Sequence, residues 1–310
     1  MEISQIWQMP SNASGDVFSS GTLNVVGISD LNQLIKDNLS RFSGRYDLIV
    51  GIPRSGLLAA NLLALHLNIP LCVLTDSGLS ETMRASRKTT TPHDKNKVRL
   101  RILVVDDSSN SGSAILRAKE TFKHVKLSCE FDVEYLAIYV TSASKGVVDS
   151  FLRIVEQPRA FEWNFLHHCF AANYLFDLDG VLCEDGPPES SDDPNTYMRH
   201  LECARPKIIP TQPIGAVVTS RLEKYRAITE MWLKKHGVEY RYLIMVNLPS
   251  AEERRRLAIH GKYKADVYRR LGGSLFIESE AWQAKEIASL TGKAVYNLQD
   301  SCLLQSHGMK

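Results

Sequence analysis

Short apolar runs recur along the chain, and most of them lead into a stretch with helical periodicity. In the first half, the runs at residues 47–51 and 101–105 are each followed by a polar loop and then by a helical pattern, over 57–67 and 113–124. Buried parallel strands have continuous apolar runs of this kind, because both faces of the sheet are covered. Two more strands are predicted at residues 71–74 and 135–140.

The second half of the chain repeats this order of elements. The runs at residues 174–176 and 214–218 predict two strands, and the second leads into a helical pattern that continues to Lys235. Two later strands and a helix are predicted at residues 242–246, 274–277 and 281–290. Strands that alternate with helices predict two α/β domains, at residues 1–165 and 166–310, with sites at the carboxyl ends of the strands.

Composition narrows the class of protein. Of 310 residues, 44% are apolar and 23% are charged, which is ordinary for a globular chain and excludes a disordered one. The net charge of +2 gives no reason to expect a nucleic-acid partner. The longest apolar stretch, at residues 57–71, is too short and too polar to span a membrane.

Two further features point to a cytoplasmic protein. The six cysteines form no Cys-x-x-Cys pair, which argues against a zinc ribbon or a disulfide framework and suits a reducing compartment. The first residues, MEISQIWQMPSNASGD, lack the basic and apolar segments of a signal peptide. The sequence leaves the oligomeric state open.

The first chemical motif lies at residues 104–114, VVDDSSNSGSA. Two adjacent carboxylates, Asp106 and Asp107, close a predicted buried strand, and a loop of small polar residues then opens a helix. Backbone N–H groups at such a helix N-terminus form a cradle for a phosphate. Carboxylates beside a phosphate could accept hydrogen bonds from sugar hydroxyls, so this pattern predicts a site for a ribose 5-phosphate.

These residues resemble the phosphoribosyl-diphosphate (PRPP) signature of type I phosphoribosyltransferases. Gly51-Ile-Pro-Arg-Ser-Gly56 resembles the pyrophosphate loop of that family, and the polar stretch from Thr75 to Arg99 falls where the family has its flexible catalytic loop. The resemblance covers residues 23–141. It implies a type I phosphoribosyltransferase fold for the N-terminal domain and PRPP, accompanied by Mg²⁺, as the substrate.

The resemblance also implies roles for individual residues. Asp106 and Asp107 would hold the ribose 2- and 3-hydroxyls, and the loop of Gly51–Gly56 would hold the pyrophosphate through Arg54, Ser55 and Gly56. The 5-phosphate would be held by Asn110, Ser111, Gly112, Ser113 and Ala114, and one or more of Arg84, Arg87 and Lys88 would close over the site. The chain departs from the family pattern at Ser108-Ser109, where an apolar pair is usual, and at Ala114, where a hydroxyl residue is common.

The second motif is Phe176-Asp-Leu-Asp-Gly-Val-Leu182, which places two aspartates and a glycine at the end of a strand. It resembles the first motif of the haloacid-dehalogenase (HAD) superfamily of phosphatases, and the other motifs of that superfamily follow in order. The resemblance implies a HAD-like Rossmannoid fold with a small cap, supplied by residues 182–213. Asp177 would be the nucleophile, and Asp179 would protonate the leaving alkoxide and then activate water.

Thr219 and Ser220 lie at the second HAD motif, where Thr219 would bind the phosphoryl group. Lys264 fits the third motif, with Lys262 as the alternative, and Glu278 fits the fourth, with Glu280 as the alternative. Mg²⁺ would be bound by Asp177, the backbone carbonyl of Asp179 and Glu278, an all-oxygen set suited to a hard cation.

Together the two motifs predict a bifunctional enzyme, because transfer of ribose 5-phosphate creates a phosphomonoester and a phosphatase consumes one. The pairing resembles the ribofuranosyltransferase systems of bacterial polysaccharide assembly, which implies a glycan acceptor, free or lipid-linked. Attack opposite the pyrophosphate would give a β-ribofuranoside with inversion. Two alternatives stay open: a nucleobase or other small metabolite as acceptor, and a regulatory protein that senses PRPP.

Overall fold

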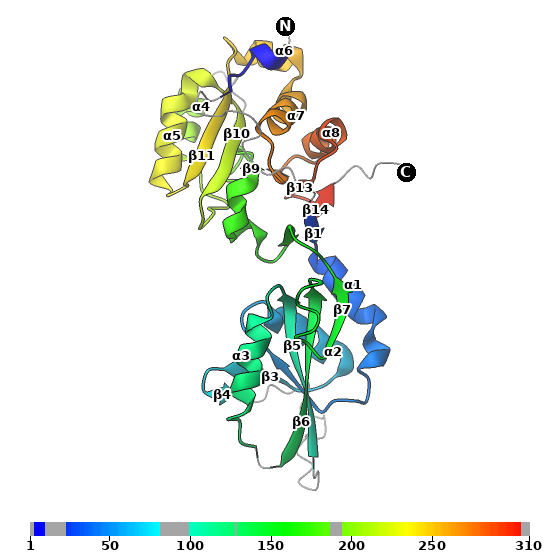
Figure 1. Ribbon diagram of the computed structural model, residues 1–310. Helices are drawn as coiled ribbons and strands as arrows, with labels where there is room; N and C mark the ends of the chain where they lie inside the picture. The colour runs from blue at the N-terminus through cyan, green and yellow to red at the C-terminus, as the bar shows by residue number, and fades with distance from the viewer. Residues whose placement is uncertain (1–2, 10–22, 81–98, 128, 187–193, 305–310) are drawn as a thin grey trace. The chain divides into compact units, whose positions relative to one another are not determined.

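The computed structural model describes residues 3–9, 23–80, 99–127, 129–186 and 194–304, and it divides into two compact units (Figure 1). The inner unit is Val26–Arg159, and the outer unit joins Met1–Val25 to Ala160–Lys310. The chain therefore starts in the outer unit, and residues 1–25 do not group with the domain that follows them. The contacts change from one unit to the other between residues 159 and 160, whereas the sequence predicts domains at residues 1–165 and 166–310.

The chain passes between the units on two short strands. Strand β1 (Asn24–Val26) enters the inner unit, β8 (Arg159–Phe161) leaves it, and the two pair as a two-stranded sheet. Entry and exit are thus neighbours, as they must be when one compact unit is inserted into another.

The inner unit contains a six-stranded sheet in the order β4-β3-β2-β5-β6-β7. All neighbouring pairs are parallel except β3 and β4. The strands are β2 (Leu48–Gly51), β3 (Leu71–Thr75), β4 (Gly78–Leu79), β5 (Arg99–Ser109), β6 (Glu130–Val140) and β7 (Ser150–Ile154). The helices are α1 (Ile28–Asp37), α2 (Gly56–Leu67) and α3 (Ser113–Phe122), with a 3₁₀ turn at Leu39–Arg41.

Strand β5 is buried on both faces, as its continuous apolar run predicts. Ile102 and Val104 share an apolar cluster with residues of α3, while the alternate residues Leu103 and Val105 lie on the face where α2 packs. Close packing of α2 requires Gly51, because a Cβ there would lie 2.6 Å from Leu57 Cδ2. The sheet is therefore covered on both sides, and its polar groups are left at the strand ends.

The outer unit contains a second six-stranded sheet, in the order β11-β10-β9-β12-β13-β14, parallel except for the last pair. The strands are β9 (Tyr174–Phe176), β10 (Ile214–Leu222), β11 (Tyr240–Val246), β12 (Leu275–Glu278), β13 (Val295–Asn297) and β14 (Cys302–Leu304). The helices are α4 (Pro194–Cys203), α5 (Arg226–Lys235), α6 (Ala251–Leu257), α7 (His260–Leu271) and α8 (Ala281–Thr291), with short 3₁₀ turns at Phe165–His167, Cys169–Asn173 and Glu223–Tyr225.

Helices cover both faces of this sheet too. Along β10, Ala216 and Val218 share an apolar cluster with residues of α7 and α8, whereas Val217 shares one with Trp232 of α5. In Figure 1, α7 and α8 lie on one side of β10 and β11, and α4 and α5 lie on the other. The chain runs outward from β9 to β11 and then returns to β12 on the other side of β9, so the strand order reverses beside β9. A ligand site is expected at such a reversal.

The first residues of the chain complete this outer unit. After a 3₁₀ turn at Ile3–Gln5, the side chains of Ile6 and Trp7 are buried in the cluster formed by α7, α8 and the sheet. The Trp7 Nε1 donates to Asp266 at 2.9 Å, and the guanidinium of Arg270 lies 4.5 Å from the indole. No local pattern in the sequence predicts this long-range contact.

Replacement of Trp7 by alanine is expected to destabilise the outer unit and leave the inner unit unchanged. Loss of a fully buried tryptophan costs about 3–5 kcal/mol of unfolding free energy. Hydrogen exchange followed by mass spectrometry would then show faster exchange in α7 and the same exchange as wild type in β5. Trp282→Ala is the matched control, because Trp282 is in the outer unit but 55% exposed. Faster exchange in β5, or an equal effect of the control, would contradict this.

Candidate functional site

The inner unit brings its predicted acidic pair next to its predicted pyrophosphate loop. Strands β2 and β5 are in register, with Gly51 opposite Val105, so the loop after β2 starts beside Asp106. A Cβ on Gly56 would lie 2.8 Å from Asp106 Oδ1 and 3.0 Å from its Cα. Only glycine allows the first turn of α2 to approach the acid pair this closely. Arg54, two residues earlier, is exposed.

The two carboxylates differ in their surroundings. Asp106 and Asp107 are 6% and 2% exposed, and Asp106 Oδ1 accepts a hydrogen bond from the Asp107 N–H at 3.0 Å. Burial, together with the adjacent Asp107 carboxylate, raises the pKa of Asp106 to about 8. In the free protein Asp106 therefore holds a proton near neutral pH, and the pair carries less negative charge than its composition suggests.

Hydrogen bonds from two hydroxyl side chains hold the loop that follows the acid pair. Ser144 Oγ donates to the Ser109 carbonyl at 2.8 Å, and Thr141 Oγ1 donates to the Asn110 carbonyl at 3.1 Å. Gly112 has a φ of +80° and precedes α3, where a side chain would collide with Val147. The backbone from Ser111 into the first turn of α3 is thus held in a shape that can present N–H groups to an anion. Ser113 and Ala114 belong to that first turn.

The third part of the predicted transferase site is not described. Arg84, Arg87 and Lys88 lie in residues 81–98, outside the described residues. Sequence reasoning also missed Arg159, whose guanidinium is buried and interacts electrostatically with Asp107. Arg159 lies at the end of the inner unit, far from any motif, so the sequence did not indicate that it would approach Asp107.

The outer unit gathers its predicted residues at the carboxyl ends of β9, β10 and β12. Lys264 Nζ donates to Asp177 Oδ2 and to Glu278 Oε2, each at 2.7 Å, and to Gln283 Oε1 at 2.9 Å. Lys264 and Glu278 are fully buried, whereas Lys262 and Glu280 are exposed. Of the alternatives left open by the sequence, Lys264 and Glu278 are the ones that meet Asp177.

This cluster is charged but buried. Burial alone would lower the pKa of Lys264, but the charges of Asp177 and Glu278 raise it, so the lysine stays an ammonium. Asp177 Oδ1 accepts from the Leu178 N–H at 2.8 Å, and Glu278 Oε1 accepts from the N–H groups of Ser279 and Glu280 at 3.0 and 3.1 Å. Burial raises the pKa of Asp177, although the charge of Lys264 opposes this rise. When both carboxylates are ionised they share one ammonium, which leaves an excess of negative charge.

That excess suits a divalent cation. Asp177, Glu278 and the carbonyl of Asp179 form an all-oxygen set, and each carboxylate oxygen can accept beyond its present donors. Within the described ranges, no three His, Cys, Asp or Glu side chains gather as a metal site, and the predicted set indeed uses only two side chains. Gly180, with a φ of +79°, makes the turn possible, because a Cβ there would lie 2.2 Å from Ser279 Oγ.

Asp179 has a partner that the sequence analysis missed. Arg221 is 1% exposed and binds the Asp179 carboxylate through both Nε, at 2.9 Å, and Nη2, at 2.5 Å. Burial would raise the pKa of Asp179, but the charge of Arg221 outweighs it and the pKa is lowered. Asp179 is therefore a carboxylate in this arrangement. The proton donation expected of it requires Arg221 to withdraw. Arg221 follows Thr219 and Ser220 directly, so the signal was present in the sequence.

The predicted cap contributes one helix near the site. Trp232 Nε1 of α5 donates to the carbonyl of Ala204, the residue that follows α4, at 2.8 Å. From α4, His200 Nε2 reaches to 3.8 Å from Asp179 Oδ1. A Cβ on Gly186 would lie 2.2 Å from the His200 ring, so the glycine leaves the space that the ring fills.

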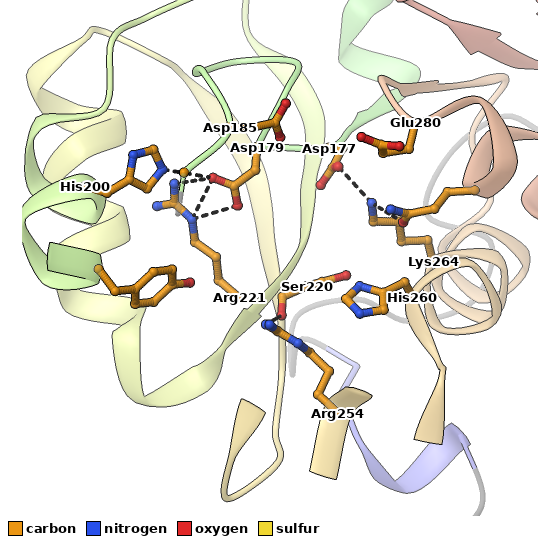
Figure 2. A pocket seen from close by; sticks show the side chains of 13 residues that line it. Asp177, Asp179, Asp185, His200, Ser220, Arg221, Arg254, His260, Lys264 and Glu280 are labelled. Carbon is orange, nitrogen blue, oxygen red and sulfur yellow. Dashed lines mark hydrogen bonds and ion pairs between the residues drawn. The ribbon is translucent and has the colours of Figure 1, made fainter. Parts of the chain in front are cut away.

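These groups surround a cavity of about 280 Å³ (Figure 2). Thr219 is fully buried beside it in β10, and its Oγ1 accepts from the Arg221 N–H at 3.2 Å. The residues that line the cavity are Asp177, Asp179, Asp185, Gly186, Tyr197, His200, Ser220, Arg221, Arg254, His260, Lys264, Glu280 and Gln283.

No helix in the described part of the chain is both long and apolar enough to cross a membrane.

Comparison with known proteins identifies the inner unit. Residues 27–163 match the family model of the phosphoribosyl transferase domain. The inner unit is therefore similar to a phosphoribosyltransferase domain, and the α/β fold expected for it is confirmed. The match covers less than half of the chain, and no protein with a curated description matches.

Three solved structures illustrate the likeness. A purine phosphoribosyltransferase from Pyrococcus horikoshii is 21% identical, with a TM-score of 0.34, and the match covers 46% of this chain and 94% of that one. A Helicobacter pylori xanthine-guanine-hypoxanthine phosphoribosyltransferase is 17% identical, with a TM-score of 0.32, and the match covers 45% of this chain and 92% of that one. An Aeropyrum pernix orotate phosphoribosyltransferase is 19% identical, with a TM-score of 0.30, and the match covers 41% of this chain and 70% of that one. The assignment rests on the family model.

The raised pKa of Asp106 predicts a pH dependence of stability. Between about pH 4 and 8 the folded chain keeps a proton that the unfolded chain has lost, so the free energy of unfolding falls as the pH rises. In Asp106→Asn this fall should be smaller. Thermal unfolding of the PRPP-free protein at about pH 5 and about pH 8.5 measures it. Asp76→Asn, at an exposed turn, is the control. An unchanged slope in Asp106→Asn would refute the assignment.

Removal of the shared ammonium should destabilise the outer unit strongly. In Lys264→Met, Asp177 and Glu278 remain buried without their cation, which costs about 3–5 kcal/mol of unfolding free energy. Adding Glu278→Gln should restore part of that loss, because the two carboxylates no longer repel each other. Urea denaturation measures both effects. The control Lys262→Met, two residues away and exposed, should change the free energy of unfolding little. A loss as large as that of Lys264→Met would show that the helix, and not the charge cluster, is responsible.

Proposed function

We propose that this chain is a bifunctional enzyme, which transfers ribose 5-phosphate from PRPP to an acceptor and then removes the 5-phosphate. The observation that carries the second activity is the contact of Lys264 with both Asp177 and Glu278 at the carboxyl ends of neighbouring parallel strands. The transferase activity is supported by the family match and by the acid pair beside the loop of residues 51–56. The first reaction makes a phosphomonoester, which the second consumes.

In the transferase reaction, Asp106 and Asp107 hold the ribose hydroxyls, and backbone N–H groups at residues 110–114 hold the 5-phosphate. Arg54 and Ser55 receive the departing pyrophosphate, whose negative charge grows as its bond to C1 breaks. Mg²⁺ bound with PRPP would add positive charge there. An acceptor hydroxyl attacks C1 from the opposite face and loses its proton, so the product is a β-ribofuranoside formed with inversion.

In the phosphatase reaction, Asp177 attacks phosphorus, and the bond between phosphorus and the ester oxygen breaks. Lys264 and Thr219 hold the phosphoryl group. Once Arg221 has withdrawn, Asp179 takes up a proton from solvent and passes it to the leaving oxygen. Water then hydrolyses the aspartyl-phosphate with Asp179 as base. Mg²⁺, held by Asp177, Glu278 and the carbonyl of Asp179, would supply charge neutralisation when bound.

The acceptor that we propose is a glycan, free or lipid-linked, in polysaccharide assembly. A salvage enzyme would gain nothing by destroying the nucleotide that it has just made, so an enzyme that removes the 5-phosphate suits an unphosphorylated ribofuranoside as final product. A panel of glycan acceptors and nucleobases, assayed for pyrophosphate release, tests this choice. Release with nucleobases alone would reject the glycan.

The two activities should separate by mutation. Asp177→Asn should still release pyrophosphate from PRPP but accumulate the 5-phosphorylated product. The double variant Asp106→Asn and Asp107→Asn should lose transfer by roughly 30-fold or more, because the charged hydrogen bond of Asp107 contributes about 1.5–3 kcal/mol and that of protonated Asp106 about 0.5–1.5 kcal/mol. It should still dephosphorylate a ready-made 5-phosphoribosyl conjugate. Pyrophosphate and phosphate release, measured separately, decide; loss of both activities in either folded variant would contradict the division.

A further inference from the structure

The ammonium of Lys264 has no N–H group left for a ligand in this structure. An ammonium carries three N–H donors and no acceptor. The three are taken by Asp177 Oδ2 at 2.7 Å, Glu278 Oε2 at 2.7 Å and Gln283 Oε1 at 2.9 Å. While these contacts last, Lys264 attracts a phosphoryl group by its charge alone. A hydrogen bond to that group from this wall of the cavity must come from another side chain.

Gln283 is placed at the cavity by the rotation of α8. The helix begins at Ala281, and its buried residues are Gln283, Ala284, Ile287 and Ala288. The last three belong to the apolar cluster formed by α7, α8 and the sheet. Gln283, which is 8% exposed, is the polar member of this buried face and lines the cavity. Burial of an amide is costly unless its polar atoms find partners, so both ends of this side chain need one.

The contact with Lys264 fixes which way the amide points. Because an ammonium only donates, the atom that faces Lys264 must be the carbonyl oxygen of the amide, and Nε2 is the free end. Among the described residues none accepts a hydrogen bond from this Nε2, and it is not one of the buried polar atoms that lack a partner. It is therefore accessible, and its two N–H groups are open to a ligand in the cavity that Gln283 lines.

These N–H groups suit an anion at the place where the phosphatase reaction would occur. Asp177 and Lys264 face each other in the cavity (Figure 2), and Gln283 contacts the same ammonium as the candidate nucleophile. An amide N–H₂ group only donates, so it cannot bind Mg²⁺, but it can donate to a phosphoryl oxygen. Hydrogen bonds to a charged group are stronger than those between neutral groups.

We propose that Gln283 is a substrate-binding residue of the phosphatase, whose Nε2 donates a hydrogen bond to an oxygen of the phosphoryl group. The inference rests on the proposed phosphatase activity and deepens it. Oε1 keeps its contact with Lys264, so one side chain both orders the lysine and contacts the group that the lysine attracts. No bond to Gln283 forms or breaks during the reaction.

The variant Gln283→Glu separates the two contacts of this side chain. It keeps an oxygen for Lys264 and replaces the N–H donors by a second carboxylate oxygen. With ribose 5-phosphate and Mg²⁺, kcat/KM should fall roughly tenfold to 100-fold, because a hydrogen bond to a charged group is lost. The inhibition constant of inorganic phosphate should rise by a similar factor. Gln299→Glu adds the same charge at an exposed position of the outer unit, so this matched control should keep both wild-type values.

Wild-type kcat/KM and wild-type inhibition by phosphate in folded Gln283→Glu would overturn the proposal and leave the phosphatase standing. Gln283→Met, which is neutral and of similar length, serves if the added carboxylate prevents folding, and unchanged inhibition by phosphate in that variant would also overturn it. Calorimetry of inorganic phosphate binding to the wild-type chain and both variants needs no turnover. Phosphate binding that is lost in the variants, without hydrolysis of ribose 5-phosphate by the wild type, would uphold the donor and reject the phosphatase.

Discussion

The outer unit depends on one buried ammonium group. Lys264 lies on α7, Asp177 follows β9, Glu278 ends β12 and Gln283 lies on α8, and all three side chains accept from its Nζ. Buried carboxylates that lose their cation are costly, whereas the complete set is fully hydrogen-bonded. The same contact that fixes the ends of these elements also fixes the candidate nucleophile. The stability of this unit therefore depends on one charge balance, which a bound cation or anion would change.

The inner unit also buries two acidic side chains, and the guanidinium of Arg159 interacts electrostatically with one of them, Asp107. Asp106 and Asp107 are buried next to each other, and the pair lowers its own charge by keeping a proton on Asp106. A ligand with two adjacent hydroxyls can then meet both an acceptor and a donor. In both units the sheet carries its polar groups at the carboxyl ends of central strands, where neighbouring loops bring them together.

The sequence predicted the features that depend on neighbouring residues and missed those that depend on residues far apart in the chain. The strands and the helices that follow them could be predicted, because each is recorded in a contiguous apolar pattern, as at β5 and α3. Asp177, Lys264 and Glu278 could be placed together through motif order. Trp7, Arg159 and Arg254 could not, because their positions result from contacts between segments far apart in the chain. In the sequence, nothing distinguishes Arg254 from its exposed neighbours. Only the orientation of α6 in the folded unit decides which arginine faces the cavity.

The contact of Trp7 with Asp266 has a consequence for synthesis on the ribosome. The first residues emerge long before α7 exists, and they must wait until more than two hundred residues have followed before they can be buried. The inner unit, whose segments are all complete by residue 159, can fold during that interval. The outer unit can be completed only after the inner one, because it joins residues from both sides of the inner unit. A chain interrupted before α7 would therefore leave Ile6 and Trp7 exposed to solvent, because α7 and α8 bury them in the complete unit.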